Sequence, residues 1–244
     1  WARGARARFL VLNTSHPGNI GASARAMKTM GLGELCLVEP KAYPSAEATA
    51  RASGADDLLA RARVFDSLDD ALQGCNLVIG ASARARSIPC PLLDPRECAA
   101  MIAEQGDGGQ AAVLFGNEQS GLSNTEMDRC QYLVRIPANP DYSSLNLAAA
   151  VQIIAYELRM AGLSEAGDVA GEQPQRVPVD SAEMERFYRH LEQVLVELDF
   201  LDPENPRQLM RRLRRLYSRA GPDSNEMNIL RGILTAMQHR CGGP

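Results

Sequence analysis

The sequence of 244 residues has no apolar run as long as the roughly 18 residues that a membrane-spanning helix needs. Its first eight residues, WARGARAR, lack the apolar stretch of a secretory signal peptide. We therefore expect no membrane contact and a cytoplasmic location. The six cysteines form no C-x-x-C pair, and the three histidines are scattered. Buried free thiols are expected rather than disulfides or a zinc site, and no metal is predicted.

Two common nucleotide-binding signatures are missing as well. No G-x-G-x-x-G follows a predicted strand and no G-x-x-x-x-G-K-[ST] occurs, which argues against a dinucleotide or P-loop site. An excess of positive charge is also absent, because 26 Lys and Arg stand against 30 Asp and Glu, for a net charge of −4. The chain is therefore not a uniformly basic nucleic-acid binder, and contact with nucleic acid would depend on a local basic segment.

Short apolar runs alternate with helical patterns over the first two-thirds of the chain. Strands are predicted at 9–13, 35–39, 63–66, 76–80, 111–115 and 132–136. Helices are predicted at 19–30, 46–52, 56–62, 68–73 and 95–104, with two more starting near 123 and after 144. This alternation predicts an α/β domain with a mainly parallel sheet and helices on both faces. Ligands bind beyond the carboxyl ends of such strands, so the loops after Gly80, Phe115 and Ile136 are expected to line one crevice.

The alternation ends at residues 164–179, where glycines and prolines among polar residues are typical of a linker. Beyond it, three amphipathic stretches predict a small helical bundle. Their expected apolar faces are Met184, Phe187, Leu191, Val194, Leu195 and Leu198; then Leu209, Leu213 and Leu216; then Met227, Leu230, Ile233, Leu234 and Met237. The predicted organisation is a domain at 1–163, a linker at 164–179 and a helical extension at 180–244.

Three stretches contain residues suited to binding or chemistry: NIGASARAM at 19–27, LFGNEQSGL at 114–122 and IPANPDYSSLNLAAAVQIIAYEL at 136–158. In the first, small neighbours around Arg25 would let a ligand or a second backbone approach, although a surface arginine is the alternative. In the second, glycines such as Gly116 allow close backbone approach, and Glu118 either faces a ligand or caps a helix. In the third, a Pro-rich turn leads into a helix, and Asn146 is either a site residue or a helix cap.

In this order, the three stretches resemble the three motifs of the SPOUT (trefoil-knotted) RNA methyltransferases. From about residue 8 to 160 the chain is similar to the bacterial tRNA ribose methyltransferases of that family. The resemblance implies a C-terminal trefoil knot in the domain, which no spacing argument would predict. It also implies a homodimer and S-adenosyl-L-methionine as the methyl donor. The implied reaction is methylation of the ribose 2′-hydroxyl of tRNA at cytidine or uridine 32 of the anticodon loop.

The resemblance also implies roles for individual residues. It implies catalytic roles for Arg25, Ser144 and Asn146. It implies cofactor binding by Ala81, Ser82, Ala83, Gly116, Glu118, Ile136, Ser143, Ser144 and Leu145. RNA contact is predicted for Arg25, Arg84, Arg86, Arg211, Arg212, Arg214 and Arg215, the last four opposite the apolar face of their helix.

Arginine stays protonated, so Arg25 is better suited to hold an RNA phosphate or stabilise a ribose alkoxide than to act as a base. The proton acceptor is left open. Two other functions are also left open: an rRNA ribose methyltransferase, and a non-catalytic RNA-binding protein.

Overall fold

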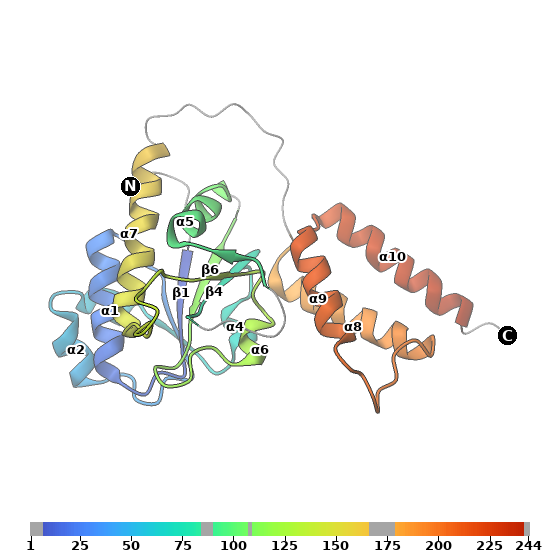
Figure 1. Ribbon diagram of the computed structural model, residues 1–244, viewed down its shortest axis with the longest axis horizontal. Coiled ribbons are helices and arrows are strands. Elements are labelled where there is room, and N and C mark those ends of the chain that lie inside the picture. The colour runs from blue at the N-terminus through green and yellow to red at the C-terminus, as the bar shows by residue number, and fades with distance from the viewer. Residues whose placement is uncertain (1–6, 84–89, 107–108, 166–178, 242–244) are drawn as a thin grey trace. The chain divides into compact units, whose positions relative to one another are not determined.

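The computed structural model describes residues 7–83, 90–106, 109–165 and 179–241 (Figure 1). The chain divides into two compact units, Trp1–Glu172 and Gln173–Pro244, which we name the sheet unit and the helical unit. The predicted boundaries at 163 and 180 stay a prediction, because most of the intervening linker, 166–178, lies outside the described residues. No helix in the described ranges is long and apolar enough to span a membrane.

The sheet unit is built on one sheet, which has seven strands in the described residues, in the order β3-β2-β1-β6-β4-β7-β5. The strands are β1 (Ala7–Leu12), β2 (Leu35–Val38), β3 (Arg63–Phe65), β4 (Leu77–Ala81), β5 (Leu92–Leu93), β6 (Ala111–Phe115) and β7 (Tyr132–Val134). Every strand pair in these residues is parallel, so the predicted parallel α/β architecture is confirmed. The sequence missed β5, because two residues are too few to show a periodic pattern. The trefoil knot stays a prediction from the family resemblance.

Helices cover both faces of this sheet (Figure 1). The helices that share one hydrophobic core are α1 (Pro17–Met30), α2 (Ala46–Ala52), α3 (Asp56–Ala60), α5 (Pro95–Ala103) and α7 (Leu147–Glu165). The short helices α4 (Leu68–Ala71) and α6 (Asn124–Met127) contribute to the second core. Strand β1 alternates between the two, because Phe9 and Val11 face the first core while Leu10 and Leu12 face the second.

Local sequence signals set several helix ends as predicted. Helix α1 ends at Gly31, which adopts the left-handed conformation with a φ of 75°. Helix α6 begins with the predicted capping box, in which the Ser123 hydroxyl accepts a hydrogen bond from the Glu126 N–H at 3.2 Å. The predicted buried face of α7 is also confirmed, since Val151, Ile154 and their neighbours on that face are buried.

Five cysteines of the described residues form no disulfide. Cys36, Cys75, Cys98 and Cys130 are buried, and Cys90 is half-buried. Burial raises the pKa of Cys75 to about 11 and that of Cys98 to about 12, so both remain protonated at neutral pH.

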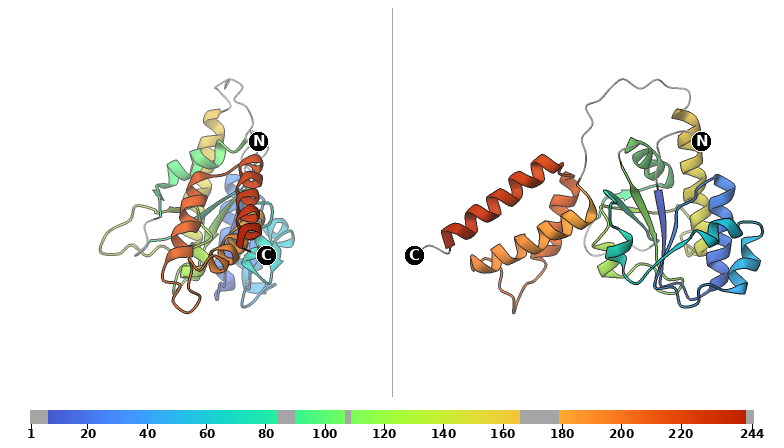
Figure 2. Two further views of the ribbon diagram at one scale, coloured as in Figure 1. Left: turned by 90° about the vertical axis from the view of Figure 1, so that its right-hand side faces the viewer. Right: turned by 180° about the vertical axis from the view of Figure 1, so that it is seen from behind.

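The helical unit contains α8 (Ser181–Glu197), α9 (Leu209–Ala220) and α10 (Ser224–Cys241), as the sequence predicts (Figure 2). The expected apolar faces are partly wrong, because Leu198 of the α8 face and Ile233 and Met237 of the α10 face are exposed. On α9, Leu213 packs on the core as expected, but Leu216 does not. The core contacts of this helix are Met210, Leu213 and Tyr217, whereas Leu216 is 47% exposed. The Tyr217 ring meets the buried Phe187 ring edge-on at 4.9 Å. The expected face was taken from leucines alone and left out Tyr217, whose aromatic ring packs into the core.

One arginine of α9 also differs from its predicted surface placement. The Arg214 guanidinium forms an ion pair with Glu185 and lies 4.5 Å from the centre of the Tyr188 ring. The Tyr188 hydroxyl in turn donates to the Arg214 carbonyl at 3.0 Å. Arg214 therefore links α9 to α8, and holding the bundle together is a role that the sequence pattern did not predict.

Candidate active site

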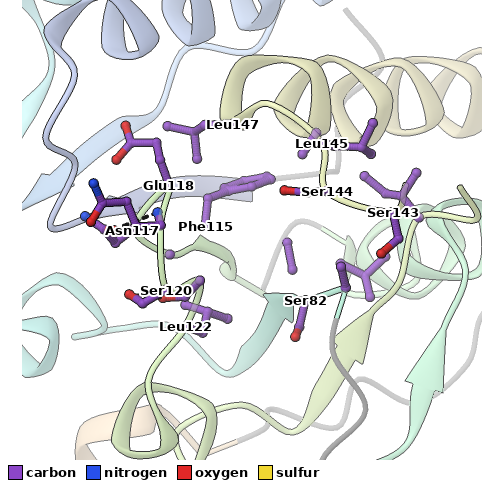
Figure 3. A pocket seen from close by; sticks show the side chains of 18 residues that line it. Ser82, Phe115, Asn117, Glu118, Ser120, Leu122, Ser143, Ser144, Leu145 and Leu147 are labelled. Atoms are coloured by element: carbon purple, nitrogen blue, oxygen red, sulfur yellow. Dashed lines mark hydrogen bonds between the residues drawn. The ribbon is translucent and has the colours of Figure 1, made fainter. Parts of the chain in front are cut away.

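A pocket of about 160 Å³ lies at the carboxyl ends of β4, β6 and β7, beside the start of α7 (Figure 3). The sheet register brings these ends together, because Ala81 is paired with Phe115 on one side and Val134 on the other. The walls consist of residues 81–83, 115–122, 134, 136, 143–145, 147 and 150. The crevice predicted after these strands is therefore present.

All nine residues predicted to bind a cofactor line this one pocket. They are Ala81, Ser82, Ala83, Gly116, Glu118, Ile136, Ser143, Ser144 and Leu145. Their part in binding stays a prediction. Sequence reasoning missed several further lining residues, including Phe115, Asn117, Gln119, Ser120 and Leu122.

Apart from Phe115, which ends β6, these missed residues belong to a loop that folds back sharply after that strand. The Asn117 carbonyl accepts from the Gly121 N–H at 2.7 Å, and its side-chain oxygen accepts from the Gln119 N–H at 2.9 Å. A Cβ atom on Gly116 would lie only 2.3 Å from the Gly121 carbonyl carbon and the Leu122 nitrogen. The loop therefore closes only with glycine at 116. An Asn immediately after a strand-end glycine was the available sign of this side-chain-supported turn.

The Glu118 carboxylate is turned away from Ser82 and Ser143 across the pocket (Figure 3). Its Oε1 accepts from the Thr14 hydroxyl and, at 2.9 Å, from the Asn19 side-chain amide. Its Oε2 accepts from both the N–H and the hydroxyl of Ser15, each at 3.2 Å. Burial raises the pKa of Glu118, but these hydrogen bonds outweigh it and hold the pKa at about 2. Glu118 is therefore ionised at neutral pH.

Asn19 extends this network from the second motif to the third. Its Nδ2 donates to Glu118, and its Oδ1 accepts from Asn146 Nδ2 at 3.0 Å. The Asn146 Oδ1 accepts from the Ala148 N–H at 2.9 Å, at the start of α7. Asn146 therefore has the geometry of a helix cap, which was the alternative to a site role. It does not line the pocket. Because Glu118 only accepts hydrogen bonds, it fixes the direction of both asparagine amides.

The three predicted catalytic residues do not gather around the pocket of one chain. Ser144 lines it, and Asn146 borders it through the network. Arg25 is exposed on α1, does not line the pocket, and has no side-chain hydrogen bond or ion pair within the described part of the chain. The predicted RNA contacts Arg84 and Arg86 lie outside the described residues. In those residues no group of three potential metal ligands occurs.

Two family models match this chain. The family model for the SpoU rRNA Methylase family matches residues 7–156, and the model for the C-terminal domain of tRNA methyltransferase TrmJ matches residues 182–244. The chain belongs to the SpoU methylase family, in its TrmJ branch. The identification thus covers both the sheet unit, with its pocket, and the helical unit.

Relatives and solved structures extend the match over almost the whole chain. The tRNA (cytidine/uridine/adenosine-2′-O-)-methyltransferase TrmJ of Pseudomonas aeruginosa is 53% identical, over 98% of this chain and 96% of that protein. The crystal structure of TrmJ from Z. mobilis ZM4 superimposes with a TM-score of 0.81 at 33% identity, covering 96% of this chain and 99% of that one. A probable methylase family protein from Haemophilus influenzae Rd KW20 gives a TM-score of 0.65 at 44% identity, with 96% of each chain covered.

Proposed function

We propose that this TrmJ family member transfers a methyl group from S-adenosyl-L-methionine to a ribose 2′-hydroxyl of tRNA. The observation that carries the proposal is the single pocket on which the second and third motifs converge, tied to the first motif through Asn19. The TrmJ relative of P. aeruginosa is named for this reaction.

The lining of the pocket fits the cofactor. Apolar side chains of Phe115, Leu122 and Leu145 supply surfaces on which an adenine ring packs. The hydroxyls of Ser82 and Ser144 and the backbone of the 116–122 loop supply polar partners beside them. Bound S-adenosylmethionine brings a methyl group that is already activated by its sulfonium. The protein's contribution is then to position the ribose oxygen and to assist loss of its proton.

Three features of the chain contribute to positioning the ribose and assisting loss of its proton. The ionised Glu118 holds Asn19, and Asn19 holds Asn146, so the turn carrying Ser144 is fixed at the start of α7. Ser144 offers a hydroxyl to the reacting ribose. Arg25, exposed and without a partner in the described residues, neutralises an RNA phosphate or the developing alkoxide.

The exposed position of Arg25 supports a homodimeric active site. In one chain Arg25 lies outside the pocket, so a second copy provides a way to bring an arginine to each bound ribose. Light scattering should then give about twice the chain mass of 26.5 kDa. A monomer with full activity would contradict this part of the proposal.

The proposed target is cytidine or uridine 32 of the anticodon loop. Labelled S-adenosylmethionine should transfer methyl to total tRNA, and mapping of 2′-O-methyl groups should locate the label at position 32. Adenosine is included as a possible substrate base because the name of the P. aeruginosa relative includes adenosine. Methylation of rRNA alone would instead favour the rRNA alternative, and no transfer to either RNA would favour a non-catalytic RNA-binding protein.

A further inference from the structure

Helix α10 carries two apolar faces, and the helical unit uses only one of them. Met227 and Leu234 are buried at 0% and 5% exposure. On another side Ile229, Ile233 and Met237 are 63%, 46% and 42% exposed. These three follow one another at intervals of four residues, so they form a continuous stripe along the helix. We name it the α10 stripe.

A glycine beside the stripe has no packing role within the described residues of the helical unit. Gly232 lies in the middle of α10, where glycine costs about 1 kcal/mol relative to alanine. A Cβ atom at this position would meet nothing within 4 Å. Ala236 lies one turn further along and is also exposed. Small residues beside an apolar stripe allow a second helix to approach closely.

The charges at the two ends of the stripe are opposite and symmetrically placed. Glu226 precedes Ile233 by seven residues and Arg240 follows it by seven, which is about two helical turns in each direction. Glu226 Oε2 accepts from the Asp223 N–H at 2.9 Å. Neither Glu226 nor Arg240 takes part in an ion pair within the described residues. Ile229 and Met237 likewise lie four residues before and after Ile233.

We propose that the α10 stripe binds the α10 stripe of a second copy of this chain, in an antiparallel pair centred on Ile233. In that register Ile233 faces its own counterpart, Ile229 faces Met237, and Glu226 faces Arg240. The same patch then serves both partners, as a two-fold interface requires. A parallel pair would instead place Glu226 beside Glu226 and Arg240 beside Arg240, which is repulsive.

The symmetry of the stripe favours a second copy over an unrelated helix. An unrelated partner needs an apolar stripe, but it does not require that the charges and side chains mirror one another about one residue. One helix pair buries less than the roughly 1,000 Å² of a free-standing interface. The pairing therefore adds to another contact between the copies, such as the proposed homodimer, although it does not depend on methyl transfer.

Cysteine cross-linking in the full-length chain tests the register. In a background with Cys90 and Cys241 replaced by serine, Ile233→Cys should form a covalent dimer with a short bismaleimide. The matched control is Thr235→Cys, which is exposed on the same helix but off the stripe. We expect dimer formation at least tenfold faster for Ile233→Cys than for the control. Equal rates, or no cross-link between chains, would overturn the proposal.

A mixture of single variants separates this register from a loose association. Ile229→Cys mixed with Met237→Cys should give linked heterodimers, whereas Ile229→Cys alone should link to itself slowly. Rapid self-linking of Ile229→Cys would overturn the antiparallel register.

Charge exchange supplies a second test. Arg240→Glu should slow cross-linking of the Ile233→Cys chain, and adding Glu226→Arg should restore it, because both partners then carry exchanged but still opposite charges. A double variant no faster than Arg240→Glu would overturn the assigned charge pairing.

Discussion

Glu118→Gln replaces one carboxylate oxygen by an amide nitrogen at the centre of the network that joins the three motifs. All four groups around Glu118 donate to it, and the Ser15 backbone N–H has no means of becoming an acceptor. The glutamine nitrogen therefore faces either Ser15 N–H or the Asn19 amide. Turning the Asn19 amide would place two NH₂ groups against each other at Asn146 and disturb the start of α7.

The expected loss follows from the donors that remain unsatisfied. Leaving one half-buried donor without an acceptor costs about 1–3 kcal/mol, which corresponds to roughly 2–12 °C in Tm for a chain of this size. Because Glu118 is only partly buried, the lower half of this range is the better expectation. Glu104→Gln is the matched control, since Glu104 is exposed and its side chain has no partner in the described residues. That control should change the free energy of unfolding by less than about 0.5 kcal/mol.

The pH dependence of the free energy of unfolding tests the role of Glu118 more directly. The folded-state pKa of Glu118 is about 2, below its usual 4.5, so its ionised form stabilises the fold. This contribution is complete above about pH 4.5 and is lost as the pH falls from 4.5 towards 2. The difference in Tm between the wild type and Glu118→Gln should therefore be large at pH 7 and shrink at pH 3. A difference that is zero at both values, or that does not change between them, would refute this reasoning.

Three further predictions address the pocket, Arg25 and the basic helix. In a thermal-shift assay, Gly116→Ala should lower the Tm and weaken stabilisation by S-adenosylhomocysteine, because the new Cβ meets the Gly121–Leu122 backbone. The control Gly33→Ala, which has open space around the new Cβ, should change neither quantity. Arg25→Ala should abolish methyl transfer in a radiolabel assay while leaving the Tm and cofactor affinity unchanged, and near-normal turnover would remove Arg25 from the mechanism. Arg212→Gln should flatten the salt dependence of tRNA binding by about one unit of slope and leave the Tm unchanged. Arg214→Gln removes the ion pair with Glu185 and should lower the Tm of the helical unit, as monitored by circular dichroism.

Periodicity and local capping made much of the fold predictable from sequence. Strand β6 is a continuous apolar run buried on both faces, so its limits were found at both ends. Gly31 and the Ser123 capping box acted through bonds to nearby residues, and both formed as predicted. Strand β5 and the α9 face were missed or misassigned, because each depends on a partner distant in sequence: β5 pairs with β7, and Tyr217 packs on Phe187.

The stretches that line the pocket could be predicted from the sequence. Six of the nine predicted cofactor-binding residues lie in the motifs, three lie in the loop after the strand predicted at 76–80, and all nine line one pocket. The contacts that these side chains make depend on how the elements pack, and the sequence did not predict them. Glu118 and Asn19 are far apart in the chain, and their hydrogen bond exists because parallel strands bring their carboxyl ends to one edge of the sheet. Arg214 forms its ion pair because α8 and α9 pack together, although its sequence neighbours suggested a solvated basic face. The periodic spacing of apolar residues along a helix or strand can be recognised in the sequence. Contacts between elements cannot, because they depend on how the elements pack.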